Sequence, residues 1–340
     1  MRAIVFTEPK SFSLEEVPDP VPGPREVLVR VEAVGICGTD IHVLDGEFAP
    51  TRYPIIPGHE TSGIVEAVGE LVTEIAIGDR VSVDPTLTCG ECAYCAVGRA
   101  NLCEQWNGSG VARTNGSTAE LTVAPVRNVH RLPDGVDLAL AALVEPLSCA
   151  IHGYDLLPRR MGEHYLIYGA GTMGLMMAQL APRAGAASVT VIDRNPDRLE
   201  VARDVGIDDV ALSADEADHA GGWDVVIDCT GVVAAIEDAL TRVRRGGVFQ
   251  QFGVAPVDAT ARFSPFGVYN DEITMVGSMA VLASYARAVE MFAAGALNAA
   301  RMVSHAYPLD DYGEALEAFR AGRGRKLQIR PQTRESVQLL

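Results

Sequence analysis

The stretch YLIYGAGTMG, residues 165–174, decides the fold of this chain. Its first four residues have the apolar and aromatic side chains of a buried strand, and the run LMMAQL that follows is typical of a helix. Between them, Gly169 permits a tight turn, Gly171 lets the backbone approach a pyrophosphate, and Gly174 lets helix and strand pack closely. The first turn of the helix then offers free N–H groups to the phosphates. The stretch therefore predicts a dinucleotide-binding turn.

The residues that follow the turn extend this prediction. Asp193 ends the next apolar run, SVTVID, where its carboxylate can accept hydrogen bonds from both ribose hydroxyls of adenosine. A 2′-phosphate there would meet like charge, so Asp193 favours NAD, whereas Arg194 and Arg198 leave NADP open because arginine pairs with phosphate. A turn that merely needs glycine and a site for an adenosyl cofactor are alternatives that the complete series disfavours. The predicted cofactor-binding residues are Gly169, Gly171, Thr172, Met173, Gly174, Asp193, Arg194 and Arg198.

Apolar strands and amphipathic helices alternate around this turn, which predicts a parallel sheet covered on both faces. The first part of the chain consists instead of short β-rich runs broken by Gly and Pro. Near the C-terminus come two helices ended by glycine and then KLQIRP, a strand that could return to the first part. The sequence thus predicts an α/β protein in which a doubly wound domain, residues 144–284, is inserted into a β-rich domain formed by residues 1–143 and 285–340.

Length and charge exclude several classes of protein. The 340 residues are enough for about two domains that each bury a core of their own. The 45 acidic residues outnumber the 28 basic ones, and a net charge of −17 argues against nucleic-acid and membrane partners. No apolar run approaches the roughly 20 residues of a membrane span, and the start MRAIVFTEPK lacks the apolar core of a signal peptide. We therefore expect a cytoplasmic protein.

Four of the seven cysteines crowd into residues 85–105, in the pattern Cys89-x2-Cys92-x2-Cys95-x7-Cys103. In a chain without an export signal such bunching indicates a metal site rather than disulfides. Four thiolates close a tetrahedral zinc shell and leave no position for a substrate, so we expect this zinc to be structural. A nucleic-acid-binding zinc finger is the alternative, and the acidic charge and the spacing disfavour it.

A second set of metal-binding side chains is scattered along the chain. Cys37, His59, Glu60 and Glu145 offer a thiolate, an imidazole and two carboxylates, which could form a zinc shell with one position left for water or substrate. Taken singly, a cysteine in an apolar run is more often a core residue, and a lone histidine is more often structural. Cys149 offers another thiolate close to Glu145, but we interpret it as a helix core residue.

Several motifs, in the same order, resemble those of a known family. They are CGTDIH at 37–42, GHE at 58–60, the four-cysteine segment, VEPL at 144–147, GAGTMG at 169–174 and VIDRN. Together they resemble the zinc-containing medium-chain dehydrogenases, most closely the polyol (sorbitol-type) and threonine dehydrogenase branch. The resemblance covers essentially the whole chain. It implies a GroES-like β-rich catalytic domain with an inserted Rossmann domain.

The resemblance also implies roles for individual residues. Cys37 and His59 correspond to ligands of a catalytic zinc, and either Glu60 or Glu145 corresponds to the third protein ligand, directly or through a water. Asp40 would accept the free N–H of His59 and fix its tautomer. This set therefore becomes the predicted catalytic metal site, separate from the structural one.

Three more residues are assigned by the same resemblance. Thr39 and His42 would relay the proton of the alcohol toward water, a task that suits the pKa of histidine. Without Cys37 beside them, a helix cap and an exposed histidine would be the simpler interpretation. Lys326, in RKLQIRP, corresponds in position to a basic residue near the cofactor pyrophosphate, with an exposed surface lysine as the alternative.

The resemblance predicts a zinc-dependent oxidoreductase with one catalytic and one structural zinc per chain. It would transfer hydride from a secondary alcohol of a polyol, sugar alcohol or cyclitol to NAD, giving a ketone. The stretch GSMAVLAS at 277–284 lacks the bulky residues of sorbitol dehydrogenases, which argues against sorbitol itself. A threonine 3-dehydrogenase-like activity and a non-catalytic cofactor-binding homologue are the alternatives. The substrate would be a small polar alcohol, and the chain a homo-oligomer, a tetramer or a dimer.

Overall fold

A computed structural model describes residues 1–48, 50–217 and 219–340. These residues form two compact units. The first unit comprises residues 1–148, 281–295 and 302–340, and the second comprises residues 149–280 and 296–301. The domain limits at 144 and 284 that we drew from the sequence remain a prediction.

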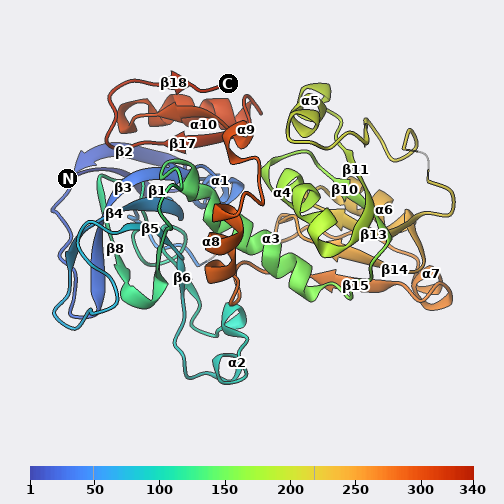
Figure 1. The fold of residues 1–340 in the computed structure, drawn as a ribbon, viewed down its shortest axis with the longest axis horizontal. Coiled ribbons are helices and arrows are strands. Elements are labelled where there is room, and N and C mark those ends of the chain that lie inside the picture. Colours follow the sequence, from blue (N-terminus) through green and yellow to red (C-terminus); the bar gives the residue numbers. More distant parts are fainter. Residues whose placement is uncertain (49, 218) are drawn as a thin grey trace. The chain divides into compact units, whose positions relative to one another are not determined.

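The second unit is built on a parallel sheet, which has six strands in the described part of the chain (Figure 1). The spatial order β12-β11-β10-β13-β14-β15 is third, second, first, fourth, fifth and sixth in chain order, the doubly wound Rossmann arrangement. The predicted fold class is therefore confirmed for this unit. The strands are β10 (Glu163–Tyr168), β11 (Ala186–Ile192), β12 (Val210–Ala211), β13 (Trp223–Asp228), β14 (Val243–Gln251) and β15 (Thr274–Gly277).

Helices alternate with these strands along the chain. Every residue of β13 is buried, as expected for a parallel strand that is covered on both faces. The helices are α4 (Thr172–Leu180), α5 (Pro196–Asp204), α6 (Val233–Thr241) and α7 (Pro265–Asn270), with a 3-10 turn at Ala181–Ala184. Two more helices, α3 (Val144–Leu156) and α9 (Ala299–Met302), contain two of the points at which the chain passes between the units.

The first unit carries a mixed sheet in the order β18-β16-β17-β3-β4-β5-β9, with β8 also paired to β3. Strand β17 near the C-terminus pairs antiparallel with β3, so the run KLQI does return to the first part of the chain. This β-rich unit confirms the GroES-like half of the predicted fold. The strands are β3 (Glu26–Gly35), β4 (Glu60–Val68), β5 (Arg80–Val83), β8 (Leu121–Pro125), β9 (Val129–Arg131), β16 (Val303–Tyr307), β17 (Lys326–Ile329) and β18 (Val337–Gln338).

Smaller elements complete the first unit. In Figure 1 the short helix α2 lies at the tip of a lobe that extends from β6. Two antiparallel pairs stand apart from the large sheet, namely β1 (Arg2–Glu8) with β2 (Ser11–Glu16) and β6 (Thr86–Leu87) with β7 (Asn107–Gly108). The helices are α1 (Gly38–Asp45), α2 (Ala93–Ala96), α8 (Tyr285–Ala293) and α10 (Tyr312–Arg320), with 3-10 turns at Ala100–Leu102, Val126–Asn128, Leu140–Leu143 and Leu309–Asp311.

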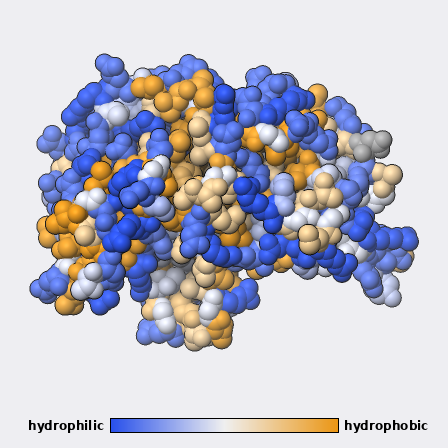
Figure 2. Space-filling model, viewed as in Figure 1, coloured by the Kyte–Doolittle hydropathy of each residue, from blue (hydrophilic) through white to orange (hydrophobic). Residues whose placement is uncertain are grey.

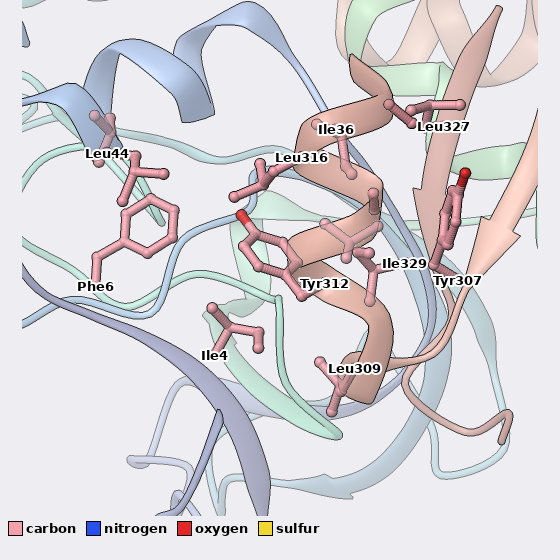
Figure 3. Packing of buried hydrophobic residues seen from close by; sticks show 14 of the residues in the cluster. Ile4, Phe6, Ile36, Leu44, Tyr307, Leu309, Tyr312, Leu316, Leu327 and Ile329 are labelled. Atoms are coloured by element: carbon pink, nitrogen blue, oxygen red, sulfur yellow. The ribbon is translucent and has the colours of Figure 1, made fainter. Parts of the chain in front are cut away.

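A hydrophobic core joins the two ends of the chain in the first unit (Figure 3). Tyr312 of α10 packs against Phe6 of β1 with 6.2 Å between ring centres, and both side chains are buried. Ile329 of β17 and Ile36 belong to the same cluster. Full burial of each such side chain contributes about 1.5–3 kcal/mol to stability. Because Ile36 stands directly before Cys37, this core fixes the backbone at the start of the candidate metal site.

Hydrophilic residues cover most of the face shown in Figure 2, with apolar residues visible between them. In the described part of the chain, every helix is too short or too polar to cross a membrane.

Candidate metal centres and cofactor site

Two neighbouring strands bring the first candidate metal ligands together. Strands β3 and β4 are antiparallel, with Gly35 at the end of β3 opposite Glu60 at the start of β4. Cys37 follows the end of β3 and His59 precedes the start of β4, so the pairing places both residues at the same edge of the sheet. The ligand atoms of Cys37, His59 and Glu60 all lie within 4.8 Å of one another.

Asp40 connects two of these ligands. Helix α1 begins with Cys37 as its N-cap, and the Asp40 carboxylate accepts the Cys37 backbone N–H through Oδ2 at 2.8 Å. Its other oxygen, Oδ1, lies 3.5 Å from Nδ1 of His59. Burial lowers the pKa of His59, but the Asp40 carboxylate and a hydrogen bond with Cys37 raise it more, so its pKa lies well above the usual value.

Glu60 is held by a buried lysine. Nζ of Lys326 lies 2.5 Å from both carboxylate oxygens of Glu60, and the two side chains are at most 4% exposed. Oε1 accepts the hydrogen bond, whereas Oε2 has no hydrogen-bond partner. Burial lowers the pKa of Lys326, but the Glu60 carboxylate raises it more, so the lysine stays charged. A Cβ atom at Gly35 would lie within 3.0 Å of both side chains, so only glycine fits beneath this ion pair.

Glu145 lies near the three ligands without being one of that close group. It stands in the first turn of α3 and is 7% exposed. Burial has the largest effect and raises its pKa, the charge of His59 opposes this rise, the repulsion of Glu60 adds to it, and together they bring the pKa to about 7. The carboxyl group of Glu145 is therefore close enough to respond to the charges of both residues.

The two residues of the predicted relay both lie on α1. Thr39 is half-buried, and its Oγ1 lies 3.7 Å from Sγ of Cys37. His42 is half-buried in the last turn, with Nδ1 2.7 Å from the Glu47 carboxylate. Thr39 is therefore in contact with the candidate metal site.

The donor set of this site suits zinc. A thiolate, an imidazole and a carboxylate are the ligand types that zinc accepts, and a catalytic site needs three protein ligands and one open position. Three buried atoms lack a hydrogen-bond partner here, namely Oδ1 of Asp40, Nδ1 of His59 and Oε2 of Glu60. Oδ1 of Asp40 and Nδ1 of His59 face each other, whereas Oε2 of Glu60 shares one lysine with Oε1, so a cation beside Oε2 would give this buried atom a partner of its own.

The second candidate metal site is formed by the four cysteines alone. The sulfur atoms of Cys89, Cys92, Cys95 and Cys103 lie within 4.8 Å of one another, and all four thiols are free. The backbone N–H of Cys92 donates to Sγ of Cys89 at 3.3 Å, and that of Cys89 donates to Sγ of Cys103 at 3.4 Å. Backbone hydrogen bonds to Cys92 lower its pKa to about 6. Four sulfur ligands fit a closed tetrahedral zinc site.

The glycine turn has the geometry that the sequence predicts. Gly169 adopts φ +97°, in the left-handed region that favours glycine. A Cβ at Gly174 would meet the backbone oxygen of Gly169 at less than 3.0 Å, whereas a Cβ at Gly171 would meet nothing within 4 Å. The third glycine thus allows helix α4 to pack on the strand, and the second leaves open space above the turn. Thr172 and Met173 are half-buried in the first turn of α4.

Asp193 is positioned next to this turn. Its Oδ2 accepts the backbone N–H of Ala170 at 2.9 Å, and its Oδ1 accepts that of Asn195 at 2.9 Å. Nη1 of Arg198 lies 3.6 Å from Oδ2, while Arg194 is exposed. The carboxylate therefore faces the glycine turn at the point where the ribose of a dinucleotide is expected.

Comparisons with known proteins agree with both halves of this description. Residues 23–134 match the model of the alcohol dehydrogenase GroES-like domain, and residues 172–294 match that of the zinc-binding dehydrogenases. The chain is 34% identical to D-arabinitol dehydrogenase 1 of Uromyces fabae over 97% of both chains. It is also 34% identical to L-threonine 3-dehydrogenase of Sinorhizobium medicae, over 96% of this chain and 98% of the relative.

A solved structure is similar throughout. A protein of Sinorhizobium meliloti 1021 that is described as a zinc-binding dehydrogenase, crystallised with NADP, superposes with a TM-score of 0.92 at 34% identity, covering 97% of this chain and 99% of its own. The chain belongs to the zinc-containing medium-chain dehydrogenases. Its relatives place it in the polyol and threonine dehydrogenase branch of that family, so it is an oxidoreductase.

In this medium-chain dehydrogenase, the sequence found the candidate ligands but missed how one of them is held. Lys326 was expected near a pyrophosphate or on the surface, and the structure places it in a buried ion pair with Glu60. Its role at the pyrophosphate remains a prediction. In the sequence, Lys326 opens the run KLQI, and nothing in that run shows that the strand is buried along all four residues. Cys149, which we interpreted as a helix core residue, lies in α3 and is only half-buried.

Proposed function

We propose that this dehydrogenase oxidises a secondary alcohol of a polyol, sugar alcohol or cyclitol to the ketone and passes hydride to NAD. The observation that carries the proposal is the ligand set, in which the carboxylates of Glu60 and Glu145 accompany Cys37 and His59 and no second thiolate joins them among the described residues. The similarity to D-arabinitol dehydrogenase 1 supports a substrate with several hydroxyl groups.

Cys37, His59 and Glu60 are the proposed ligands of the catalytic zinc. When bound, zinc would act as a Lewis acid that lowers the pKa of the substrate hydroxyl. The distances within the group support Glu60 as the third ligand, and Glu145 would lie next to it. Lys326 would limit the negative charge that Glu60 brings to the site. The four cysteines would hold the structural zinc.

Thr39 and His42 are the proposed proton path. Oγ1 of Thr39 would accept the proton of the substrate hydroxyl and pass its own proton on. His42 would take up that proton at the outer end, where the Glu47 carboxylate on Nδ1 orients the ring. Asp40 would hold His59 in the tautomer whose Nε2 is free to bind metal.

The glycine turn and Asp193 are the proposed NAD site. Two backbone N–H groups hold the Asp193 carboxylate, which could then accept hydrogen bonds from both hydroxyls of the adenosine ribose. A 2′-phosphate would face this negative charge. NADP remains the alternative because Arg198 lies beside the carboxylate and could pair with the phosphate.

A substrate panel tests the proposal. Polyols, cyclitols and L-threonine are assayed separately with NAD and NADP at slightly alkaline pH, with Cys37→Ser as the control for contaminating activity. We expect NADH formation on at least one polyol or cyclitol, and much less in Cys37→Ser. If no polyol or cyclitol is oxidised with either cofactor, the proposed substrate class is wrong.

L-threonine is the second candidate substrate, because the chain is equally similar to an L-threonine 3-dehydrogenase. L-threonine carries an ammonium group and a carboxylate that a polyol lacks, and the carboxyl group of Glu145 beside the proposed ligands could pair with the ammonium group. Faster NADH formation on L-threonine than on every polyol in the same panel would favour this assignment.

A homo-oligomer is proposed from the sheet edge of the second unit. Strand β15 pairs only with β14 in the described part of the chain, which leaves its other edge open. Large apolar side chains are exposed in β15, in the segment that connects it to β14 and just after β15, and open sheet edges commonly pair with a second copy. Light scattering after gel filtration should give the mass of a dimer or a tetramer, and Tyr269→Lys should weaken the association of the subunits. The exposed residues are Val254, Val257, Phe263, Phe266, Tyr269, Met275 and Met279.

The cytoplasm is the proposed compartment. The four clustered thiols must stay reduced to bind zinc, and the cytoplasm is reducing. Fractionation of the source cells followed by an assay for the enzyme tests this assignment, and recovery outside the cytoplasm would contradict it.

A further inference from the structure

The loop formed by residues 107–118 lies directly on the segment that leads into His59. Three hydrogen bonds join their backbones. Gly116 N–H donates to Ile56 at 2.7 Å, Thr118 N–H to Pro57 at 2.9 Å, and Ser117 N–H to Gly58 at 3.0 Å. The last acceptor, the carbonyl oxygen of Gly58, belongs to the peptide bond that links Gly58 to His59. The loop is therefore hydrogen-bonded to the backbone immediately before His59, a candidate metal ligand.

Three glycines make this approach possible. A Cβ at Gly110 would lie within 3.0 Å of the oxygen, carbon and nitrogen of Gly58. A Cβ at Gly116 would come equally close to the oxygens of Gly58 and Pro57 and to the Cα of Gly110. Gly58 itself adopts φ +93° and has Thr118 against its open side. Because the atoms that Gly110 and Gly116 meet are all backbone atoms, no side-chain rotation can make room for a methyl group at these two positions.

The four-cysteine lobe anchors the same loop. The backbone N–H of Trp106 donates to the carbonyl of Cys103 at 2.9 Å, and β7 at the start of the loop pairs with β6 just before the lobe. Within the loop, Gly110 N–H donates to Thr114 at 2.7 Å. Hydrogen bonds thus hold the chain at several points between the last cysteine and Gly110.

We propose that Gly110 and Gly116 are positioning residues, which press on Gly58 and thereby fix His59 relative to Cys37 and Glu60. The four-cysteine lobe then contributes to the catalytic site by holding this loop in place. The inference rests on the proposed function in one respect, the catalytic role of His59. A misplacement of about 1 Å at a reacting centre costs on the order of 100-fold in rate. A methyl group in this contact should therefore lower the rate of the catalysed reaction.

The test compares Gly116→Ala with Gly135→Ala. Gly116 lies outside the left-handed region, so alanine there changes the contact without straining its own φ. Gly135 has φ +85° and nothing within 4 Å of its Cβ position, so its alanine variant carries backbone strain without a contact. Gly110→Ala, at φ +75°, provides a second variant at the contact. All are prepared as full-length enzyme.

Two readouts are independent of turnover. Cobalt replaces zinc at the catalytic site, and its visible d–d absorption reports the ligand geometry. The rate at which a chelator removes that metal reports how well the ligands are held. Both are measured together with kcat, KM, the pH profile of kcat/KM and the thermal midpoint.

We expect Gly116→Ala and Gly110→Ala to alter the cobalt spectrum and to speed metal loss about 10–100-fold, the range for groups that orient metal ligands. We also expect kcat to fall by a similar factor while KM stays within a few-fold, and Gly135→Ala to match the wild type in the spectrum and in metal loss. A spectrum in both contact variants identical to that of Gly135→Ala overturns the proposal. If neither contact variant folds while Gly135→Ala does, the contact serves folding, and the positioning role is wrong.

This inference and the proposed function fail in different ways. If the wild-type enzyme oxidises no alcohol, the proposed function fails, yet the cobalt spectra still decide whether the glycines position His59. If the wild type is active and the contact variants keep its spectrum, only the positioning role fails.

Discussion

The two candidate metal centres are built in opposite ways. The cysteines of the four-cysteine lobe span fifteen residues, on a lobe whose cysteines are mostly half-exposed. The second centre combines Cys37 at the N-cap of α1, His59 just before β4, Glu60 at the start of β4 and the nearby Glu145 on α3. His59, Glu60 and Glu145 are each at most 7% exposed.

In the lobe, metal binding would create the local structure, whereas at the second centre the fold already holds the ligands in place. The lobe lacks a core of its own, so metal binding and lobe folding are one event. The second centre is held by the pairing of β3 with β4, by Asp40 and by the buried Glu60–Lys326 ion pair. Loss of metal should therefore unfold the lobe, whereas at the second centre it should abolish activity and leave the structure intact. Four changes test this contrast.

The largest effect is expected from Cys37→Ser. Removing a ligand should exceed the roughly 10–100-fold losses that follow when a residue merely orients a ligand, so we expect kcat/KM to fall more than 100-fold. Zinc content should drop by one ion per chain while the thermal midpoint changes little, because the surrounding core does not depend on the thiol. Metal analysis and calorimetry on the same sample check both. Full activity with one zinc lost would place the catalytic metal elsewhere.

Asp40→Ala should have the next largest effect. It removes the acceptor of the Cys37 N–H and the carboxylate near Nδ1 of His59. Metal affinity at the catalytic site should fall about 10–100-fold, measured by competition with a chelator. Asp40→Asn is the matched control, since an amide oxygen can still cap α1 but has no charge to offer His59. Equal affinities in both variants and the wild type would contradict a role for Asp40 at the metal.

The contrast also explains what the sequence could and could not predict. The lobe was predicted from the spacing of its cysteines, and the glycine turn from a strand, three glycines and an acid, because in both cases the relevant contacts are local. Cys37, His59 and Glu60 carry no such spacing, and the residues alone left them ambiguous. Their grouping depends on β3 pairing with β4, a long-range contact that only family resemblance supplied in advance.

Two close contacts between distant segments were not predicted. Lys326 was assigned by its position in a motif, and its partner Glu60 lies 266 residues earlier in the chain. The need for glycine at position 35 follows from that ion pair, and the need for glycine at 110 and 116 follows from a loop pressed on Gly58. Glycines that allow a close approach resemble any other glycine until the partner backbone is known.

Cys103→Ser should mainly affect stability. We expect the lobe to lose its zinc and the thermal midpoint to fall by several degrees, given about 2–4 °C per kcal/mol for a domain of this size. At temperatures well below the midpoint, kcat should fall only to the extent that the loop at 107–118 loosens. Cys149→Ser, a thiol outside both metal groups, is the control. A Cys103→Ser enzyme that loses this zinc yet keeps its stability would show that the lobe does not need metal, and an unchanged zinc content would show that Cys103 is not a required ligand.

The smallest effect concerns Glu145 in zinc-free protein. Burial raises its pKa from an ordinary 4.5 to about 7, so the folded state binds its proton more tightly than the unfolded state does. The protonated carboxyl therefore adds stability that is fully present below pH 4.5 and is lost as pH rises through 7. Denaturant titrations should show the difference in stability between wild type and Glu145→Gln changing across that window, by no more than about 1.4 kcal/mol per pH unit. A difference independent of pH would mean that Glu145 titrates normally. The buried centre would then lack the low-dielectric character that distinguishes it from the four-cysteine lobe.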